Sequence, residues 1–249
     1  MGVIIKSDRE IAVMRRAGRV VATVLGILIK ELEAGMKTKE LDAITGRELA
    51  RLGAKPSFKG YRGFPANLCV SVNDEIVHGI PGERVLAEGD IVSLDLGAIV
   101  DDFQGDAAVT VGIGEISREA ARLLKTTELA LEAGMNKACA GARLGDVSAA
   151  IQEYAESRGY SVIREYTGHG IGREMHEEPQ IPNFGKRGTG LMLEPGMTLA
   201  LEPMVSVGDW RTRLGSNRWT VSTVDGSLAA HFEHTVAVND AEPEVLTLV

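Results

Sequence analysis

Residues 88–113, EGDIVSLDLGAIVDDFQGDAAVTVGI, contain the pattern from which the fold of the chain is predicted. Two runs of β-forming residues flank the polar pair Asp101-Asp102, which predicts a β-hairpin. Asp95 and Asp106 lie on opposite arms of this hairpin. A two-residue turn would place both carboxylates on one face, directly opposed or one step diagonal.

Asp95 has an apolar neighbour on each side, Leu94 and Leu96, so we expect its carboxylate to be buried. Like charges that face each other across a hairpin destabilise it, and a buried carboxylate is costly without a partner. A shared cation removes the conflict. The alternatives are a strongly raised pKa of one carboxyl group or a turn of odd length that points the two groups apart. The hairpin alone leaves these three interpretations open.

The composition is typical of a folded domain in a reducing compartment. The chain has 249 residues, 44% of them hydrophobic, so it can bury a substantial core as one large domain or two small ones. Its net charge of −8 disfavours nucleic acid or an anionic membrane as a partner. We expect neither a signal peptide nor a membrane span, and the two cysteines fit the cytoplasm.

The second half of the chain repeats the plan of the first. Helical spacing predicts two helices within residues 7–53 and two more within residues 117–159, each pair followed by strand-like segments. The pentapeptide LEAGM occurs at residues 32–36 and again at residues 131–135, where we expect the first helix of each pair to end. An internal repeat of this kind indicates a duplication.

Carboxylates occupy corresponding places in the two halves. Asp95 and Glu202 each follow a glycine by six residues, whereas Asp106 and Glu233 open the similar hexapeptides DAAVTV and EHTVAV. The four acidic side chains would therefore converge where the halves meet.

We predict a single α+β domain over residues 1–249, with pseudo-symmetric halves of about 1–115 and 116–249. An antiparallel sheet would lie at the pseudo-twofold axis, with the helices packed outside it.

The histidines gather near these carboxylates. All five lie in or beside strand-like segments: His78, His169, His176, His231 and His234. Four carboxylates with one or two imidazoles suit a pair of divalent ions (Mn, Fe(II), Co or Zn) better than a structural zinc, which would take thiolates. Two such ions can generate a hydroxide at neutral pH and polarise a carbonyl, which indicates a hydrolase.

Competing motifs fail on their spacing. In GHGIG, residues 168–172, the third glycine comes one residue too early for a dinucleotide-binding loop. HEEPQ, residues 176–180, ends in Gln where a zinc-binding HExxH helix needs His.

Five segments, in this order and at these spacings, resemble the type I methionine aminopeptidases: VNDEIVHGIP, DLGAIVDDFQGDAAVTV, TGHGIGREMHEEPQIPNFG, LEPGMTLALEPM and GSLAAHFEHTVAV. The resemblance covers essentially the whole chain and implies the pita-bread fold, which is a duplicated α+β domain. It also implies that the protein removes the initiator methionine from nascent chains in the cytoplasm.

The resemblance implies a ligand set for two divalent metal ions. Asp95 would chelate one ion, and Asp106 and Glu233 would bridge both. His169 and Glu202 would complete the coordination of the second ion.

The same resemblance assigns the catalytic and substrate-binding residues. Glu202 would shuttle the proton while a water or hydroxide between the ions attacks the first peptide carbonyl. His78 would contact the scissile amide, and His176 would hydrogen-bond the carbonyl oxygen. The methionine pocket maps onto Tyr61, Phe64, Cys69 and Trp219, with Phe58 and Met175 at its edge.

Four positions depart from the common pattern of the family: Gly97, Gln104, Ala107 and Ala229. The first three are expected to change the hydrogen bonds around Asp95 and Asp106, and so the metal affinity and preference. Ala229 lacks the side chain often found near a monovalent-cation site. We interpret His231 and His234 as structural residues that point away from the ligands or are buried.

The expected partner is the N-terminal methionine of nascent peptides, with a transient ribosome association, and we expect the protein to be a monomer. One alternative is a peptidase of the same fold directed at proline, although such relatives usually carry an additional N-terminal domain. The other is a non-catalytic pita-bread module used for binding, although such modules typically lose metal ligands.

Overall fold

The central hairpin forms as predicted. In the computed structural model, which describes residues 2–248, β4 (Ile91–Val100) and β5 (Phe103–Gly112) pair antiparallel along their whole length. The turn, Asp101-Asp102, has left-handed backbone torsions at both positions (φ 47° and 62°), which match the right-handed twist of the strands. A turn of even length keeps corresponding faces of the two arms together.

The register fixes where the two acidic side chains of the hairpin lie. Asp95 is opposite Ala108, and Asp106 is opposite Gly97, so the carboxylates lie one step diagonal on the same face. The alternative of a turn that points them apart is thereby excluded.

The hairpin lies within an antiparallel sheet of order β1-β4-β5-β14-β9-β7-β8, with β2 added on β4 and β15 on β14. The other strands of this sheet are β1 (Lys55–Pro56), β2 (Cys69–Val72), β7 (Thr167–Gly170), β8 (Glu177–Pro182), β9 (Thr198–Leu201), β14 (Glu233–Ala237) and β15 (Glu244–Val245). Two three-stranded sheets contain β6 (Ser161–Val162), β10 (Met204–Ser206) and β13 (Ala229–His231), and β3 (Glu75–Val77), β11 (Thr212–Leu214) and β12 (Val221–Thr223).

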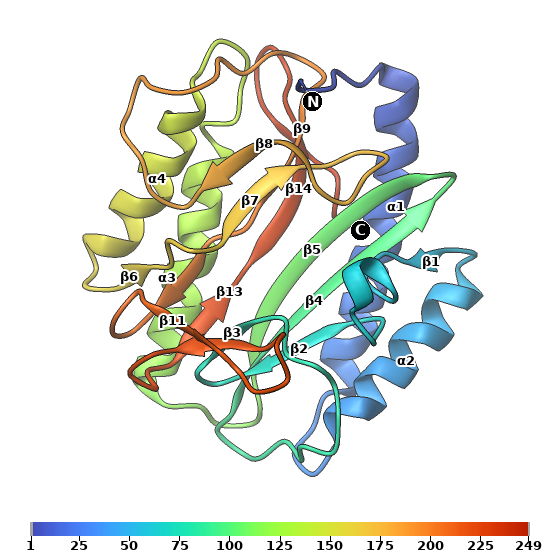
Figure 1. Ribbon diagram of the computed structural model, residues 1–249, viewed down its shortest axis with the longest axis vertical. Helices are drawn as coiled ribbons and strands as arrows, with labels where there is room; N and C mark the ends of the chain where they lie inside the picture. Colours follow the sequence, from blue (N-terminus) through green and yellow to red (C-terminus); the bar gives the residue numbers. More distant parts are fainter. Residues whose placement is uncertain (1, 249) are drawn as a thin grey trace.

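Four α-helices among the described residues pack outside the sheet (Figure 1). They are α1 (Asp8–Glu31), α2 (Thr38–Arg51), α3 (Arg118–Met135) and α4 (Leu144–Glu156), and a 3-10 turn, η1 (Tyr61–Gly63), precedes β2. Helix α1 packs on β4 and β5, where a Cβ at Gly105 would lie 2.7 Å from the backbone nitrogen of Gly18. The glycine therefore lets the helix approach the strand closely.

The seam between the halves lies where β5 pairs with β14. Glu233 is opposite Ala108, and on either side of this pair a threonine hydroxyl joins the two backbones. The hydroxyl of Thr110 accepts from the His231 amide and donates to the His231 carbonyl, both at 2.8 Å. The Thr235 hydroxyl likewise accepts from the Asp106 amide at 3.1 Å and donates to the Asp106 carbonyl at 2.8 Å. In each bridge a threonine hydroxyl from one side of the seam binds both backbone groups of a residue on the other side.

The segments that lead into α2 and α4 have the same backbone conformation and hydrogen bond, but the matching glycines are not both in the LEAGM pentapeptides. The amides of Gly35 and Gly141 donate to the Leu86 and Leu193 carbonyls, at 2.8 and 2.9 Å, and both glycines have positive φ. Gly134 of the second LEAGM copy lies inside α3 instead.

The two LEAGM copies do lie where the first helix of each pair ends, as predicted, but they are not in equivalent positions. The first copy follows the end of α1, whereas the second lies in the last turns of α3. The spacing of Gly89 before β4 and Gly196 before β9 does correspond, with φ of 89° and 87°.

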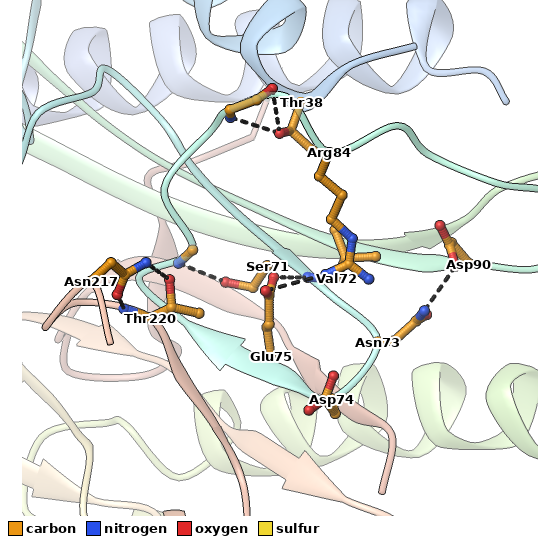
Figure 2. Close-up of polar contacts among 12 residues, drawn as sticks. Thr38, Ser71, Val72, Asn73, Asp74, Glu75, Arg84, Asp90, Asn217 and Thr220 are labelled. Atoms are coloured by element: carbon orange, nitrogen blue, oxygen red, sulfur yellow. Dashed lines mark hydrogen bonds and ion pairs between the residues drawn. The ribbon is translucent and has the colours of Figure 1, made fainter. Parts of the chain in front are cut away.

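His78 follows β3, and polar side chains order the segments around it, among them Ser71, Glu75 and Thr220, which Figure 2 shows. His78 has a left-handed backbone (φ 59°), and a Cβ at Gly79 would lie 2.0 Å from the Val70 carbonyl oxygen, so only glycine fits there. The Gly79 amide donates to the Ser71 hydroxyl at 3.1 Å, and the Thr220 hydroxyl lies 3.5 Å from the His78 carbonyl. These contacts fix the direction in which the imidazole leaves the backbone.

Over residues 2–248, none of the helices combines the length and the apolar composition that a membrane crossing requires.

Candidate active site

All eleven residues predicted to form the site line one cavity of about 140 Å³: Tyr61, Phe64, Cys69, His78, Asp95, Asp106, His169, His176, Glu202, Trp219 and Glu233. Phe58 and Met175, expected at its edge, line it too, and so does Arg62, which the sequence analysis did not single out. The cavity has a carboxylate-rich end and an aromatic end.

The sheet brings the acidic residues together. Asp95 and Asp106 come from β4 and β5, Glu233 comes from β14 across the seam, and Glu202 follows β9. Asp95, Asp106 and Glu233 are at most 8% exposed, so water does little to separate their charges.

His169 lies among these carboxylates as a neutral ligand would. Its Nε2 is 3.5 Å from Oε1 of Glu202 and 3.9 Å from Oδ2 of Asp106. Its Nδ1 lies 2.9 Å from the Gly170 carbonyl oxygen, to which the ring N–H donates, so Nε2 carries the lone pair. Burial lowers the pKa of His169 to about 4, which keeps the ring neutral. A lone pair facing carboxylate oxygens leaves room for a cation between them.

Some oxygens of the carboxylates also lack a positively charged or hydrogen-bonding partner within residues 2–248. Asp95 Oδ1, Asp106 Oδ1 and Glu233 Oε1 are buried and have no hydrogen-bond partner among the described residues. Burial raises the pKa of Asp95 to about 7, and burial with the neighbouring carboxylates raises the pKa of Asp106, Glu202 and Glu233 well above their ordinary range.

Ligand atoms from Asp106, His169 and Glu233 lie within 4.8 Å of one another, close enough to share a metal ion. The unpaired oxygens, the raised carboxyl pKa values and the free lone pair of His169 all fit a site for divalent cations.

His231 belongs to this cluster, although the sequence interpretation treated it only as a structural residue. It is buried, as expected, but its Nε2 lies 3.8 Å from Oε2 of both Glu202 and Glu233. Neither ring nitrogen has a hydrogen-bond partner among the described residues. Because β13 runs directly into β14, a residue two positions before Glu233 shares its face, and strand periodicity could have revealed this.

His234 lies on the other face, as expected. Its Nδ1 is 2.8 Å from the Thr247 hydroxyl, and it lines a groove between α1 and α3 behind the sheet.

His176 and His78 lie at the rim of the carboxylate cluster. The Tyr61 hydroxyl is 2.9 Å from Nδ1 of His176, and when it donates there the ring proton lies on Nε2. Burial, followed by His169 and Arg62, lowers the pKa of His176 to about 3, and burial lowers the pKa of His78. Both imidazoles are therefore neutral near pH 7 and can donate one hydrogen bond each.

The other end of the cavity is a compact apolar cluster. Phe64 meets the edges of Phe58 and Trp219, with ring centroids 6.5 and 5.2 Å apart. Cys69 and Met175 complete it, each 3% exposed. Such a wall suits an unbranched, polarizable side chain.

Comparison with known proteins accounts for this combination. The model of metallopeptidase family M24 matches residues 12–240. The chain belongs to metallopeptidase family M24. A methionine aminopeptidase of Clostridium acetobutylicum is 54% identical over 99% of both chains, and methionine aminopeptidase 1 of Bacillus subtilis is 49% identical over 99% of this chain and 100% of that protein.

Solved structures of other peptidases have the same fold. The crystal structure of methionine aminopeptidase from Thermotoga maritima superposes with a TM-score of 0.98 at 47% identity and full coverage of both chains. An Xaa-Pro dipeptidase from Bacillus anthracis shares the fold alone, with a TM-score of 0.79 at 24% identity, and this chain covers 61% of it. The predicted pita-bread α+β fold and the resemblance to methionine aminopeptidases are confirmed.

Two of the positions at which this chain departs from the common family pattern, Gly97 and Gln104, both contact Ser57. A Cβ at Gly97 would lie 2.6 Å from that of Ser57, so the serine occupies the space that a larger residue would need. The Ser57 hydroxyl donates to Gln104 Oε1 at 2.6 Å, and Gln104 Nε2 donates to the Arg173 carbonyl at 3.2 Å. Gln104 thereby connects the hairpin to the loop that carries His176.

The other two departures lie away from the ligands. Ala107 lines the groove behind the sheet, so its expected contact with the ligand carboxylates is wrong, because neighbouring strand residues face opposite ways. Ala229 is buried in an apolar cluster beside Met204.

A buried ion pair anchors the segment next to His176. Lys6 Nζ lies 2.5 Å from Oε2 of Glu177, and both side chains are at most 5% exposed. The other oxygen of Glu177 accepts from the Glu174 amide at 3.3 Å. The N-terminal segment therefore holds the loop from which His176 projects.

Proposed function

We propose that the chain is a methionine aminopeptidase that removes the initiator methionine from nascent proteins with a pair of divalent metal ions. The observation that carries the proposal is one cavity with unpaired buried carboxylates at one end and an apolar aromatic wall at the other. An N-terminal methionine carries a free amine on its Cα and a thioether two methylene groups away, and these two groups match the two ends.

Five residues would hold the ions: Asp95, Asp106, His169, Glu202 and Glu233. Glu233 is opposite Ala108 and therefore one step diagonal to Asp106 across the seam, and ligand atoms of the two carboxylates lie within 4.8 Å, which supports their role as the shared ligands. When bound, such ions lower the pKa of a water so that hydroxide is available at neutral pH, and they polarise the scissile carbonyl as Lewis acids.

The residues around the ions then move protons and orient the peptide. Glu202 is partly exposed, unlike the other carboxylates, so we assign it the transfer of the proton from water to the leaving nitrogen. His176 donates from Nε2 to the carbonyl oxygen as it gains negative charge, and His78 orients the scissile amide. Phe64, Trp219 and their neighbours enclose the methionine side chain and exclude water.

The setting of the proposal follows from its substrate. Initiator methionines are exposed as chains leave the ribosome, so we place the protein in the cytoplasm as a monomer in transient contact with ribosomes. The two free cysteines agree with a reducing compartment. Carboxylate and imidazole ligands accept Mn, Fe(II), Co and Zn, and all four belong to the proposal.

The test is metal-by-metal reconstitution of chelated protein with Met-Gly-Met-amide and Ala-Pro-amide peptides as substrates. We expect metal-dependent release of methionine and little cleavage before proline. The variant Glu233→Gln should lose activity and bind metal weakly in calorimetry, whereas Asp102→Asn, at the exposed hairpin tip, should behave as the wild type. Preferential X-Pro cleavage, or near-normal turnover in Glu233→Gln, would contradict the proposal.

A further inference from the structure

We infer that Arg62 is a specificity-determining residue that binds a carboxylate of the substrate downstream of the cleaved bond. The inference rests on the proposed function and adds a preference that the metal centre and the methionine pocket do not supply. The carboxylate has two sources: an acidic side chain near the N-terminus of a protein, or the C-terminal carboxylate of a short peptide.

Arg62 lies at the mouth of the cavity. Among the lining residues only Arg62 and His176 are exposed, and the others are buried or partly buried. The amine and the methionine side chain occupy the inner end, so the rest of the peptide leaves past these two residues. An extended chain advances roughly 3.3 Å per residue, so the first few residues after the methionine pass the guanidinium.

The guanidinium of Arg62 is available to a ligand. It forms no ion pair and donates no side-chain hydrogen bond within residues 2–248, and its central carbon lies 5.3 Å from the ring centroid of Tyr61. Stacking on that ring restricts the side chain without using its N–H donors. Tyr61 in turn contacts His176, so Arg62 is held next to a residue assigned to the reaction.

Two further features distinguish this arginine. Among residues 2–248 it is the only cationic side chain lining the cavity, whose other charged groups are the four carboxylates assigned to the metal ions. Two divalent ions would balance those carboxylates, so Arg62 would be the charged side chain that the outgoing peptide meets at the mouth. Its backbone is left-handed (φ 49°), between Gly60 and Gly63, which are also left-handed. A long side chain at a position that favours glycine is held there at a conformational cost.

The preference opposes the charge of the whole protein. At net −8 the protein attracts cationic peptides, so a preference for acidic ones has to come from a local group. An exposed guanidinium–carboxylate contact changes kcat/KM by about two- to fivefold at low salt, and 1 M salt screens it.

The experiment measures kcat/KM for the metal-reconstituted protein on Met-Gly-X-Gly-amide peptides with X as Asp, Asn or Lys. Met-Gly-Asn-Gly with a free C-terminus forms a separate arm. We expect the Asp peptide, the free acid or both to exceed the Asn amide by about two- to fivefold at low salt. The Arg62→Gln variant should abolish that ratio, and Arg62→Glu should invert it. The Asp and free-acid arms identify the source of the carboxylate.

Arg218→Gln is the matched control. Arg218 also has a left-handed backbone (φ 63°) and lies next to Trp219, but it does not line the cavity. Its substitution changes the net charge equally and should leave the ratio intact. An unchanged ratio in Arg62→Gln, equal loss in Arg218→Gln, or no preference in the wild type overturns the inference. Failure to cleave the Asn amide would instead refute the proposed function.

Discussion

Replacing Asp95 by asparagine should stabilise the metal-free protein while it removes a metal ligand. Burial holds the pKa of Asp95 at about 7 in the folded state, against an ordinary value of 3.8. Because the folded-state value is the higher one, the stability of the metal-free protein is greatest below the unfolded pKa. It falls as the pH rises from about 4 to 7.

The size of the effect follows from that gap. About three pKa units at about 1.4 kcal/mol each give a penalty of about 4 kcal/mol above pH 7. The buried amide of asparagine offsets about 1–3 kcal/mol of the gain, because Oδ1 of Asp95 has no partner that its NH₂ group can use. The net expectation is a stabilisation of about 1–3 kcal/mol at pH 8.

Urea unfolding of both proteins in the presence of a chelator, from pH 5 to 8, measures this change. Burial lowers the pKa values of His169, His176 and His231 to about 4 or 3, and unfolding returns these rings to about 6.5, so they change the stability of both proteins alike and cancel in the difference between them. The stability of Asp95→Asn relative to the wild type should rise with pH, and Asp95→Asn should be the more stable protein at pH 8. Asp102→Asn, at the exposed turn, is the control. A stability difference between the two proteins that is the same at pH 5 and pH 8, or an Asp95→Asn protein less stable than the wild type at pH 8, would refute the electrostatic reasoning.

Three further substitutions test other parts of the site. Tyr61→Phe should lower kcat about tenfold or more with little change in KM, because it frees His176 while keeping the ring, and steady-state kinetics would contradict this if KM alone rose. Lys6→Met should cost about 3–5 kcal/mol in thermal unfolding because it leaves the buried Glu177 carboxylate unpaired, and the double variant with Glu177→Met should recover much of that loss. His231→Leu should weaken metal binding about 10–100-fold in calorimetry, and unchanged affinity would show that this imidazole does not support the ligands.

Most of the fold could be predicted from the sequence because the patterns that indicate helices and strands are local. The hairpin followed from β-forming runs around Asp101-Asp102, and the helix that begins after Ser7 followed from a capping box that the structure contains. Helix ends were less accurate: α1 stops at Glu31, before the glycine at residue 35 that was expected to end it. A glycine after a helix sets the turn but does not fix the last hydrogen bond.

The metal-ligand set and the aromatic wall were predicted from motifs, but residues that reach the site through the fold were not. Arg62 has no motif, and only the left-handed turn between two glycines directs it to the mouth. Ser57, directly after β1, explains Gly97 on β4 through a contact between residues that lie 40 positions apart in the sequence. Contacts of this kind depend on how distant segments align with one another, and this alignment could not be predicted from the single sequence.

The threonine bridges extend the contact between β5 and β14 beyond the residues that pair directly. The strands pair at Glu233 and His234, and on either side Thr110 and Thr235 each satisfy both backbone groups of one residue on the other side with a single hydroxyl. Each hydroxyl is held by one accepted and one donated hydrogen bond, which restricts its rotation. Because one of these bonded residues is Asp106 itself, the joint sets the distance between the carboxylates that the two strands contribute.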